Sequence, residues 1–207
     1  MTKRRPANKL ILELDSSASP THGHQEGTAF NGHFGCNCYH PLFCFKHRGY
    51  PERALRRKGN VQTADDWESV LAPIMARHRN RAIPKFFRGD AGFTAPDIYR
   101  LLESEGEGYA TRLKSNPILE RPIEPLLTRP LGRGTGMPDA RHQAFEYQAA
   151  GWDRPRQGIA KVAWFPDRLL PAVGFTVTNR TWAARRVTQS TTEGALPSRG
   201  SKKASMP

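Results

Sequence analysis

The order of apolar segments within residues 9–113 constrains the fold more than any other feature of this sequence. In chain order they favour strands at 9–16, 38–47 and 50–58, a helix with Thr63 as its N-cap, a strand at 83–93, a helix at 95–106 and a strand at 108–113. Strands connected through helices become parallel neighbours, whereas strands joined by short loops become antiparallel ones. This order predicts an α/β fold, in which a mixed sheet carries helices on its faces.

The chain changes character after residue 116. Residues 117–141 are rich in Pro, Arg and Gly and are expected to be extended. Strands of a separate β-rich insert are predicted at 142–149, 158–165 and 172–179. The predicted organisation is a disordered N-terminus at 1–8, a core at 9–116, a β-rich insert with a returning strand at 117–180 and a disordered C-terminal tail at 181–207.

The chain is strongly basic. Lys and Arg number 32 against 19 Asp and Glu, which gives a formal net charge of +13 and a pI near 10.2. Such an excess favours a polyanionic partner, most often nucleic acid, over a merely soluble basic protein. No stretch approaches the roughly 18 apolar residues of a membrane-spanning helix, so no membrane partner is expected. The three cysteines and the lack of a signal peptide favour a cytoplasmic location.

Two aspartates lie at the ends of predicted strands. Asp15 ends the strand at 9–16, and Asp90 lies near the C-terminal end of the strand at 83–93. If these strands are neighbours, both carboxylates point into one crevice. Clustered carboxylates repel one another and need divalent cations between them, and hard oxygen ligands suit Mg²⁺ or Mn²⁺. Either aspartate alone is more simply a turn former or a helix cap, so the prediction rests on the pair.

Basic side chains provide candidate contacts to phosphate groups. The candidates are Arg53, Arg56, Arg57, Lys58 and Arg88. Contacts of this kind would make DNA binding depend on salt concentration. A solvated basic face without a ligand is the alternative interpretation.

A group of cysteines and histidines suggests a metal site of another kind. Cys36, Cys38 and His40, with His33 and Cys44 nearby, are residue types that zinc prefers. We expect the two cysteines of the Cys-x-Cys pair to point to opposite faces of a strand, and no second pair follows. A hairpin with buried thiols is therefore favoured over a zinc module.

Three segments resemble one known family. Bacterial insertion-sequence transposases of the DDE class have a first catalytic segment similar to residues 12–43, LELDSSASPTHGHQEGTAFNGHFGCNCYHPLF. Their second segment is similar to residues 87–113, FRGDAGFTAPDIYRLLESEGEGYATRL, and the strand before their third resembles residues 173–179, VGFTVTN. The resemblance implies an RNase H-like fold, a Mg²⁺ requirement and the cutting and joining of transposon DNA ends. It also implies that Asp15 and Asp90 are the first two catalytic acids.

The third acid of that family is missing from the expected place. The family has a late helix with the pattern Tyr, two residues, Arg, three residues, Glu, six residues, Lys, whereas Glu193 is the one carboxylate after VTN here. Back-translation shifted by one nucleotide allows Tyr, Arg, Glu and Lys at the slots of Thr191, Gly194, Ser198 and Ser205, with the family's spacing. We hypothesise a frameshift near residue 189.

The N-terminal part is also shorter than in the family. Such transposases usually carry a helical region that binds DNA ends, and only fourteen residues precede Asp15. A fragment shortened at both ends is therefore expected.

Two classes of function follow. The first is a DDE transposase that is inactive here and binds Mg²⁺ (or Mn²⁺) weakly, because one of three carboxylates is absent. Its expected partners are transposon DNA ends and either a second copy of the chain or a full-length transposase. The alternative is a non-catalytic basic DNA-binding remnant with the same fold. A metal-dependent cleavage assay with Asp15→Asn and Asp90→Asn separates the two.

Overall fold

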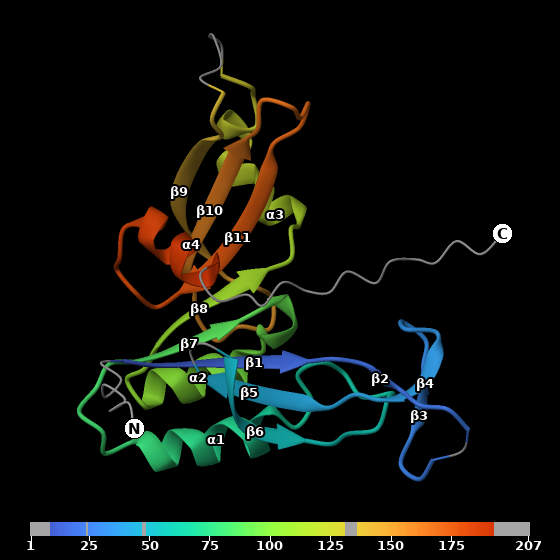
Figure 1. The fold of residues 1–207 in the computed structure, drawn as a ribbon. Coiled ribbons are helices and arrows are strands. Elements are labelled where there is room, and N and C mark those ends of the chain that lie inside the picture. Colours follow the sequence, from blue (N-terminus) through green and yellow to red (C-terminus); the bar gives the residue numbers. More distant parts are fainter. Residues whose placement is uncertain (1–8, 24, 47–48, 131–135, 193–207) are drawn as a thin grey trace, which may run out of the picture.

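The computed structural model describes residues 9–23, 25–46, 49–130 and 136–192, which form a large mixed sheet with helices on its faces (Figure 1). The strands of this sheet are β1 (Leu10–Ser16), β5 (Leu42–Lys46), β6 (Tyr50–Leu55), β7 (Lys85–Gly89), β8 (Gly108–Leu113), β9 (Asp139–Tyr147), β10 (Arg156–Trp164) and β11 (Ala172–Thr178). Their order across the sheet is β6-β5-β1-β7-β8-β11-β10-β9. The predicted RNase H-like α/β class is confirmed.

The direction of each strand follows from its connection. β5 pairs antiparallel with β6, to which a short segment joins it. β1 pairs antiparallel with β5, and the chain between these two strands includes β2 (Ser19–Pro20), β3 (Ala29–Asn31) and β4 (Cys36–Tyr39). α1 (Trp67–His78) precedes β7 and α2 (Pro96–Ser104) precedes β8, and β1, β7 and β8 are parallel neighbours. The predicted sequence of antiparallel strands followed by crossovers is confirmed.

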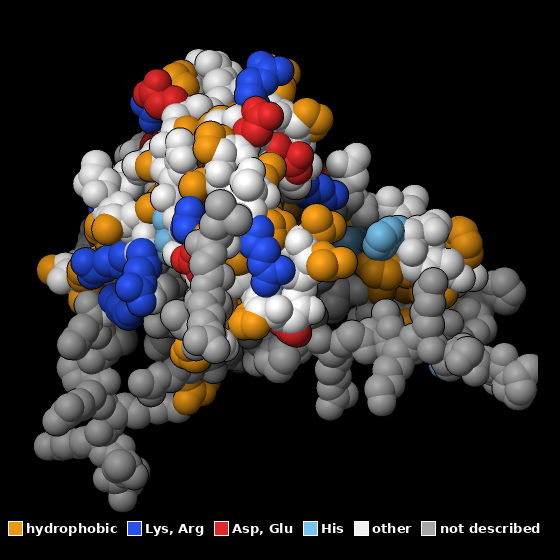
Figure 2. Space-filling view, turned by 90° about the horizontal axis from the view of Figure 1, so that it is seen from above, with side chains coloured by type: hydrophobic (Ala, Val, Ile, Leu, Met, Phe, Trp, Pro, Cys, Tyr) orange, Lys and Arg blue, Asp and Glu red, His pale blue; other side chains and the backbone are white. Residues whose placement is uncertain are grey.

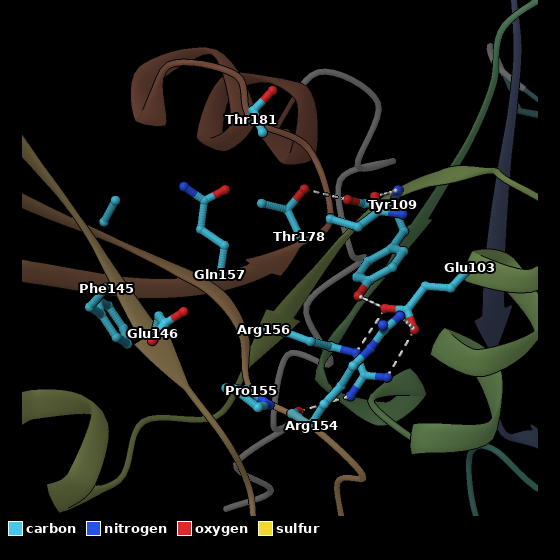
Figure 3. A pocket seen from close by; sticks show the side chains of 12 residues that line it. Glu103, Tyr109, Phe145, Glu146, Arg154, Pro155, Arg156, Gln157, Thr178 and Thr181 are labelled. Atoms are coloured by element: carbon cyan, nitrogen blue, oxygen red, sulfur yellow. Dashed lines mark hydrogen bonds and ion pairs between the residues drawn. The ribbon is translucent and has the colours of Figure 1, made fainter.

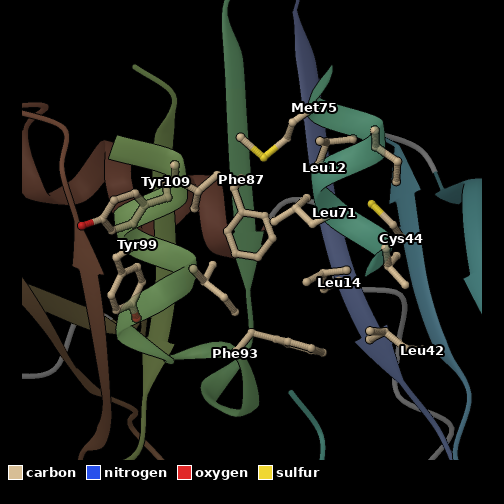
Figure 4. Packing of buried hydrophobic residues seen from close by; sticks show 14 of the residues in the cluster. Leu12, Leu14, Leu42, Cys44, Leu71, Met75, Phe87, Phe93, Tyr99 and Tyr109 are labelled. Carbon is tan, nitrogen blue, oxygen red and sulfur yellow. The ribbon is translucent and has the colours of Figure 1, made fainter. Parts of the chain in front are cut away.

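Alternation along the strands divides the core between the two faces of the sheet. Leu12 and Phe87 point toward α1 and α2 and pack in the largest hydrophobic cluster (Figure 4). α4 (Ala184–Thr192) lies on the opposite face, where Val187 packs with Ile11. The two faces therefore have separate cores, and we call the second one the α4 face.

The last three strands extend the main sheet instead of forming a sheet of their own. β11 pairs antiparallel with β8, and β10 and β9 follow. Helical segments α3 (Pro117–Glu120) and η3 (Arg121–Leu126) replace part of the extended segment expected at 117–141 and bury Leu119 and Ile123. That expectation was wrong because proline suits the first turn of a helix, and the Asn116 side chain caps α3. The domain boundaries stay a prediction.

α4 is a second correction. We expect no regular structure from residue 181, yet residues 184–192 form a helix. Its sequence holds little apolar material, and its stability comes from contacts with the sheet, above all at Val187. The remainder of the predicted tail, 193–207, and the predicted disordered N-terminus, 1–8, lie outside the described residues.

The predicted strand at 38–47 is divided between two sheets. β4 (Cys36–Tyr39) pairs with β2 (Ser19–Pro20) and β3 (Ala29–Asn31) in a small three-stranded sheet, which we call the arm. Pro41, which has no N–H for a ladder, separates β4 from β5. The arm projects beyond the end of β1 (Figure 1).

The first long helix also begins later than predicted. Asp66, not Thr63, precedes its first residue, with a left-handed backbone at φ 58°. None of the helices in the described ranges is long and apolar enough to cross a membrane.

Candidate active site

Asp15 and Asp90 lie side by side at the C-terminal ends of two parallel strands. β1 and β7 are paired up to Glu13 and Arg88, so two further residues bring Asp15 level with Asp90. Glu13 and Arg88 lie on the α4 face, and residues two apart in a strand share a face. The structure therefore brings the two predicted carboxylates together on one face, next to the helix that covers it.

A tight turn positions Asp90. The short helix η2 (Ala91–Phe93) begins directly after it, and the Asp90 carboxylate accepts a hydrogen bond from the Gly92 N–H at 2.7 Å. A Cβ at residue 92 would lie 2.5 Å from Cγ2 of Thr63, so only glycine fits here without a shift. Asp90 thus caps a helix through one of its two carboxylate oxygens. A helix cap is the simpler interpretation of this residue from the sequence.

The charges of the two aspartates interact. Both residues are exposed. Partial loss of water and the negative charge of Asp90 raise the pKa of Asp15, and a hydrogen bond from the Ser16 backbone offsets part of this increase. Two carboxylates that repel each other are stabilised by a cation between them, and hard carboxylate oxygens suit a divalent ion.

The aspartate pair fits a divalent metal in part. Asp15 and Asp90 supply two carboxylates of the right chemistry on one face. Within the described ranges, no group of three or more His, Cys, Asp or Glu side chains is arranged to hold a metal ion. The candidate metal ligands that the structure describes at this site are therefore the carboxylates of Asp15 and Asp90.

An ion pair lies directly behind the aspartates. Glu13 and Arg88 come two residues earlier on the same strands and form a salt bridge. The Arg88 guanidinium also donates a hydrogen bond to the Ser190 carbonyl oxygen at 2.7 Å, which ties the end of α4 to the sheet beside the site. Sequence reasoning missed Glu13, although its spacing of two from Asp15 places it on the same face.

Two of the predicted DNA contacts are internal. Arg88 is buried between Glu13 and α4, with 8% of its side chain exposed. Arg57 is buried as well and donates to the carbonyl oxygens of His40 at 2.9 Å and Gln62 at 3.2 Å. Both guanidinium groups hold the scaffold together, and neither lies on a surface that DNA can reach.

The other basic candidates are on the surface. Arg53, Arg56 and Lys58 are exposed on β6 and the segment that follows it, at the edge of the sheet. Arg56 lies over the Tyr39 ring of the arm, with its Cζ 5.2 Å from the ring centre. These three side chains remain available to a polyanion.

The structure corrects the reason given against zinc. Residues i and i+2 of a strand share a face, so Cys36 and Cys38 lie on the same side of β4. Burial and the neighbouring Cys36 thiol together raise the pKa of Cys38. His40 is buried, with Nδ1 3.1 Å from the Val61 carbonyl oxygen, and Cys44 belongs to the core of the main sheet. Cys38 fits the predicted hairpin with buried thiols, because it lies in a small antiparallel sheet and its side chain is buried.

One cavity lies away from the aspartates. It has a volume of about 650 Å³, and its walls include Glu103, Tyr109, Arg154 and Arg156 (Figure 3). Tyr109 is at the start of β8, whereas the aspartates are at the C-terminal ends of strands parallel to β8. The Glu103 carboxylate accepts hydrogen bonds from both arginines and from the Tyr109 hydroxyl. These hydrogen bonds connect α2 with β8 and with the N-terminal end of β10.

Comparison with known proteins identifies one family. The family model described as transposase DDE domain group 1 matches residues 1–194, which include both aspartates and α4. A search of curated proteins finds no match. Because the family model matches well over half of the chain, this protein belongs to the transposase DDE domain family.

Proposed function

We propose that Asp15 and Asp90 are the first two acids of a site for Mg²⁺-dependent DNA cleavage and strand transfer, and that this chain is catalytically inactive. Membership of the family gives the chain a role in DNA transposition, with transposon DNA as its partner and a divalent metal ion as the general cofactor. The observation that carries the proposal is the parallel register of β1 and β7, which places two charge-coupled carboxylates level on one face.

The two carboxylates would hold a hard cation, Mg²⁺ or Mn²⁺. When bound, a pair of such ions activates a water or a 3′-hydroxyl and stabilises the leaving oxygen of a phosphodiester. The protein's own part is to orient Asp15 and Asp90. The Gly92 N–H fixes one oxygen of Asp90, and the Glu13–Arg88 pair anchors both strands behind the site.

The proposed inactivity rests on the sequence after residue 179. The Tyr, Arg, Glu and Lys pattern of the family's third motif does not occur there, and the family match ends at residue 194. A frameshift near residue 189 accounts for both. Metal binding by two carboxylates is then weaker than by three, because each lost ligand removes charge that compensates the dehydration of the ion.

A non-catalytic DNA-binding remnant is the second candidate. It is favoured by the net charge of +13 and by the exposed Arg53, Arg56 and Lys58. In this role the chain binds transposon DNA, another copy of itself or a full-length transposase of a bacterial insertion sequence. We place either form in the cytoplasm, which the three free cysteines support.

One experiment tests the inactive state by nicking and separates the two candidates by metal binding. The chain is incubated with Mg²⁺ or Mn²⁺ and supercoiled plasmid, and nicking is followed on a gel together with Asp15→Asn and Asp90→Asn variants. We expect no nicking by any of the three proteins and weak Mn²⁺ binding by calorimetry, lost in both variants. Nicking by the parent chain that either variant abolishes would overturn the inactive state, and metal binding unaffected by both would overturn the site.

A further inference from the structure

A row of basic side chains begins beside the aspartate pair. β8 pairs with β7 so that Arg88 is opposite Ala110, and two further residues bring Arg112 level with Asp90. Ala110 is buried on the α4 face, and Arg112 shares that face. Arg112 is exposed and donates to the Thr191 carbonyl oxygen at 3.5 Å, at the end of α4.

The row continues on the last two strands. Lys161 of β10 lies directly opposite His142 of β9. Lys161 follows Ile159 by two residues, and Ile159 packs with α4, so both basic side chains are on the α4 face. Arg185 of α4 is close enough for its positive charge to act on His142. Burial first, and then the charges of Lys161 and Arg185, lower the pKa of His142.

The strand between the two parts of the row has no side chain at one position of this face. Gly174 of β11 lies opposite Lys161, on the strand between β8 and β10. A Cβ placed on Gly174 would meet no atom within 4 Å. At the level of Lys161, β11 therefore presents no side chain to a backbone that crosses it, and Thr176, which lies opposite Arg112 on the same face, is buried.

The charges of the row have no ion-pair partner among the residues that the structure describes. In the ranges that the structure describes, Arg112, Lys161 and Arg185 take part in no ion pair. On the helical side formed by α1, by contrast, Arg77 and Arg79 each contact a glutamate. Figure 2 shows Lys and Arg side chains gathered at the side of the molecule where α4 lies in Figure 1.

Four carboxylates of the same face lie near the row, and none forms an ion pair with Arg112, Lys161 or Arg185 among the described residues. Asp15 and Asp90 are at the start of the row, next to Arg112, where the proposed metal ion would take up their charge. Glu13 is taken up by Arg88. Glu146 is opposite Gln157, four residues along β9 from His142, where it borders the large cavity. Crowded cations without acidic partners are stabilised by a polyanion.

We infer that Arg112, Lys161 and Arg185, the cationic row, together with the imidazole of His142 beside them, bind the sugar–phosphate backbone of duplex DNA leading away from Asp15 and Asp90. This inference rests on the proposed function, because it uses the aspartate pair as the place of the scissile bond. The row and His142 cross four strand spacings of about 4.8 Å from β7 to β9, roughly 19 Å in all. At about 3.4 Å per base pair this is about five or six base pairs.

The test measures binding of the full 207-residue chain to a short fluorescein-labelled DNA duplex by anisotropy at several NaCl concentrations. The triple variant Arg112→Gln, Lys161→Gln, Arg185→Gln removes three charges from the row. We expect Kd to rise at least about tenfold near 0.1 M salt, and the slope of log K against log salt to fall by about 2 to 3.

A matched triple variant controls for net charge. Arg121→Gln, Arg141→Gln, Arg168→Gln removes the same charge from exposed residues of η3, of β9 and of the loop after β10. Arg141 is next to His142 and points to the opposite face. We expect this variant to keep Kd within about threefold of the parent chain and to keep most of the salt slope.

The outcomes distinguish two failures. If the parent chain binds the duplex and both triple variants weaken it equally, or the control weakens it more, the cationic row is wrong while a DNA-binding function stands. If the parent chain does not bind duplex at all, the DNA partner of the proposed function fails as well. Circular dichroism spectra of both variants must match the parent chain at the assay temperature, because Arg112 also donates a hydrogen bond to Thr191 at the end of α4.

Discussion

Asp15 is a residue whose charge costs free energy in the folded, metal-free protein. Desolvation and Asp90 raise the pKa of Asp15 above its ordinary value. Above both the folded and the unfolded pKa the carboxylate is ionised in both states, and the folded state bears the repulsion. As pH falls through the folded pKa, Asp15 takes up a proton and this cost disappears.

Asp15→Asn should therefore stabilise the metal-free protein at neutral pH. The gain is expected to stay below about 1 kcal/mol, because exposed charges are screened by water. Thermal melts should show a higher Tm at pH 7 and convergence with the parent chain as pH falls. The exposed Asp167→Asn serves as a control with no gain, and a lower Tm for Asp15→Asn would contradict the repulsion.

Arg156 illustrates the opposite case, a buried charge with partners. Its side chain is 3% exposed and contacts Glu103 at 2.9 Å and Asp153 at 3.0 Å. Burial alone would raise the pKa of Glu103, but hydrogen bonds from Arg156, Arg154 and Tyr109 outweigh it and lower the pKa. The pair therefore stabilises the fold above the unfolded pKa of Glu103, and this contribution is lost as pH falls through the folded pKa.

Arg156→Ala should destabilise the protein by roughly 3 kcal/mol at pH 7, because it leaves Glu103 without its buried partner. Urea denaturation measures the loss. Arg154→Ala removes an exposed partner of the same carboxylate and should cost much less. Equal losses in the two variants would show that burial of the pair does not matter.

The arm depends on a close approach of three backbone segments. The Asn31 side chain donates to the Gly59 carbonyl oxygen at 2.6 Å. A Cβ on Gly59 would come within 2.4 Å of the carbonyl oxygens of Ala29 and Cys38, which belong to β3 and β4. Backbone atoms cannot turn away as a flexible side chain can, so the arm must move if this space is filled.

Gly59→Ala should accordingly cost about 1 to 3 kcal/mol, as overpacking does in a close-packed interior. The displaced arm should also expose the Cys38 thiol, which is fully buried in the parent chain. Faster reaction of Cys38 with a thiol reagent, measured by mass spectrometry, is the second sign. Gly32→Ala, where an added Cβ meets no atom within 4 Å, should change neither property.

α4 shows how an element can depend on the rest of the molecule. Its residues lack a broad apolar stripe, and one buried valine packs between strands far apart in the chain. Arg88 and Arg112 bind carbonyl oxygens near its C-terminal end, where cations are favourable. These contacts exist only after the sheet has formed, which is why local periodicity predicted no helix there.

For the whole molecule, the face that α4 covers combines two aspartates with an excess of basic groups. If the third acid was lost through a frameshift, returning the gene to the other frame after residue 189 should restore it. The repaired protein should nick DNA with Mg²⁺ and bind Mn²⁺ more tightly than the present chain. Plasmid nicking by the repaired protein, absent from its Asp15→Asn variant, is the measurement. If the other reading frame of the gene does not encode the Tyr, Arg, Glu and Lys pattern, the frameshift hypothesis is wrong, and this can be checked before any protein is made.

Local sequence patterns were enough to place most strands, α1 and α2, and both aspartates, because alternation and helical spacing are short-range properties of a chain. Family-like segments around Asp15 and Asp90 indicated the fold and the class of protein. The partnership of the two aspartates, the burial of Arg57 and Arg88, and the helix at 184–192 followed from strand register and packing. Register joins residues far apart in sequence, and one residue of slip would turn every side chain to the other face. For that reason the cationic row, built from β8, β10 and α4, became visible only in three dimensions.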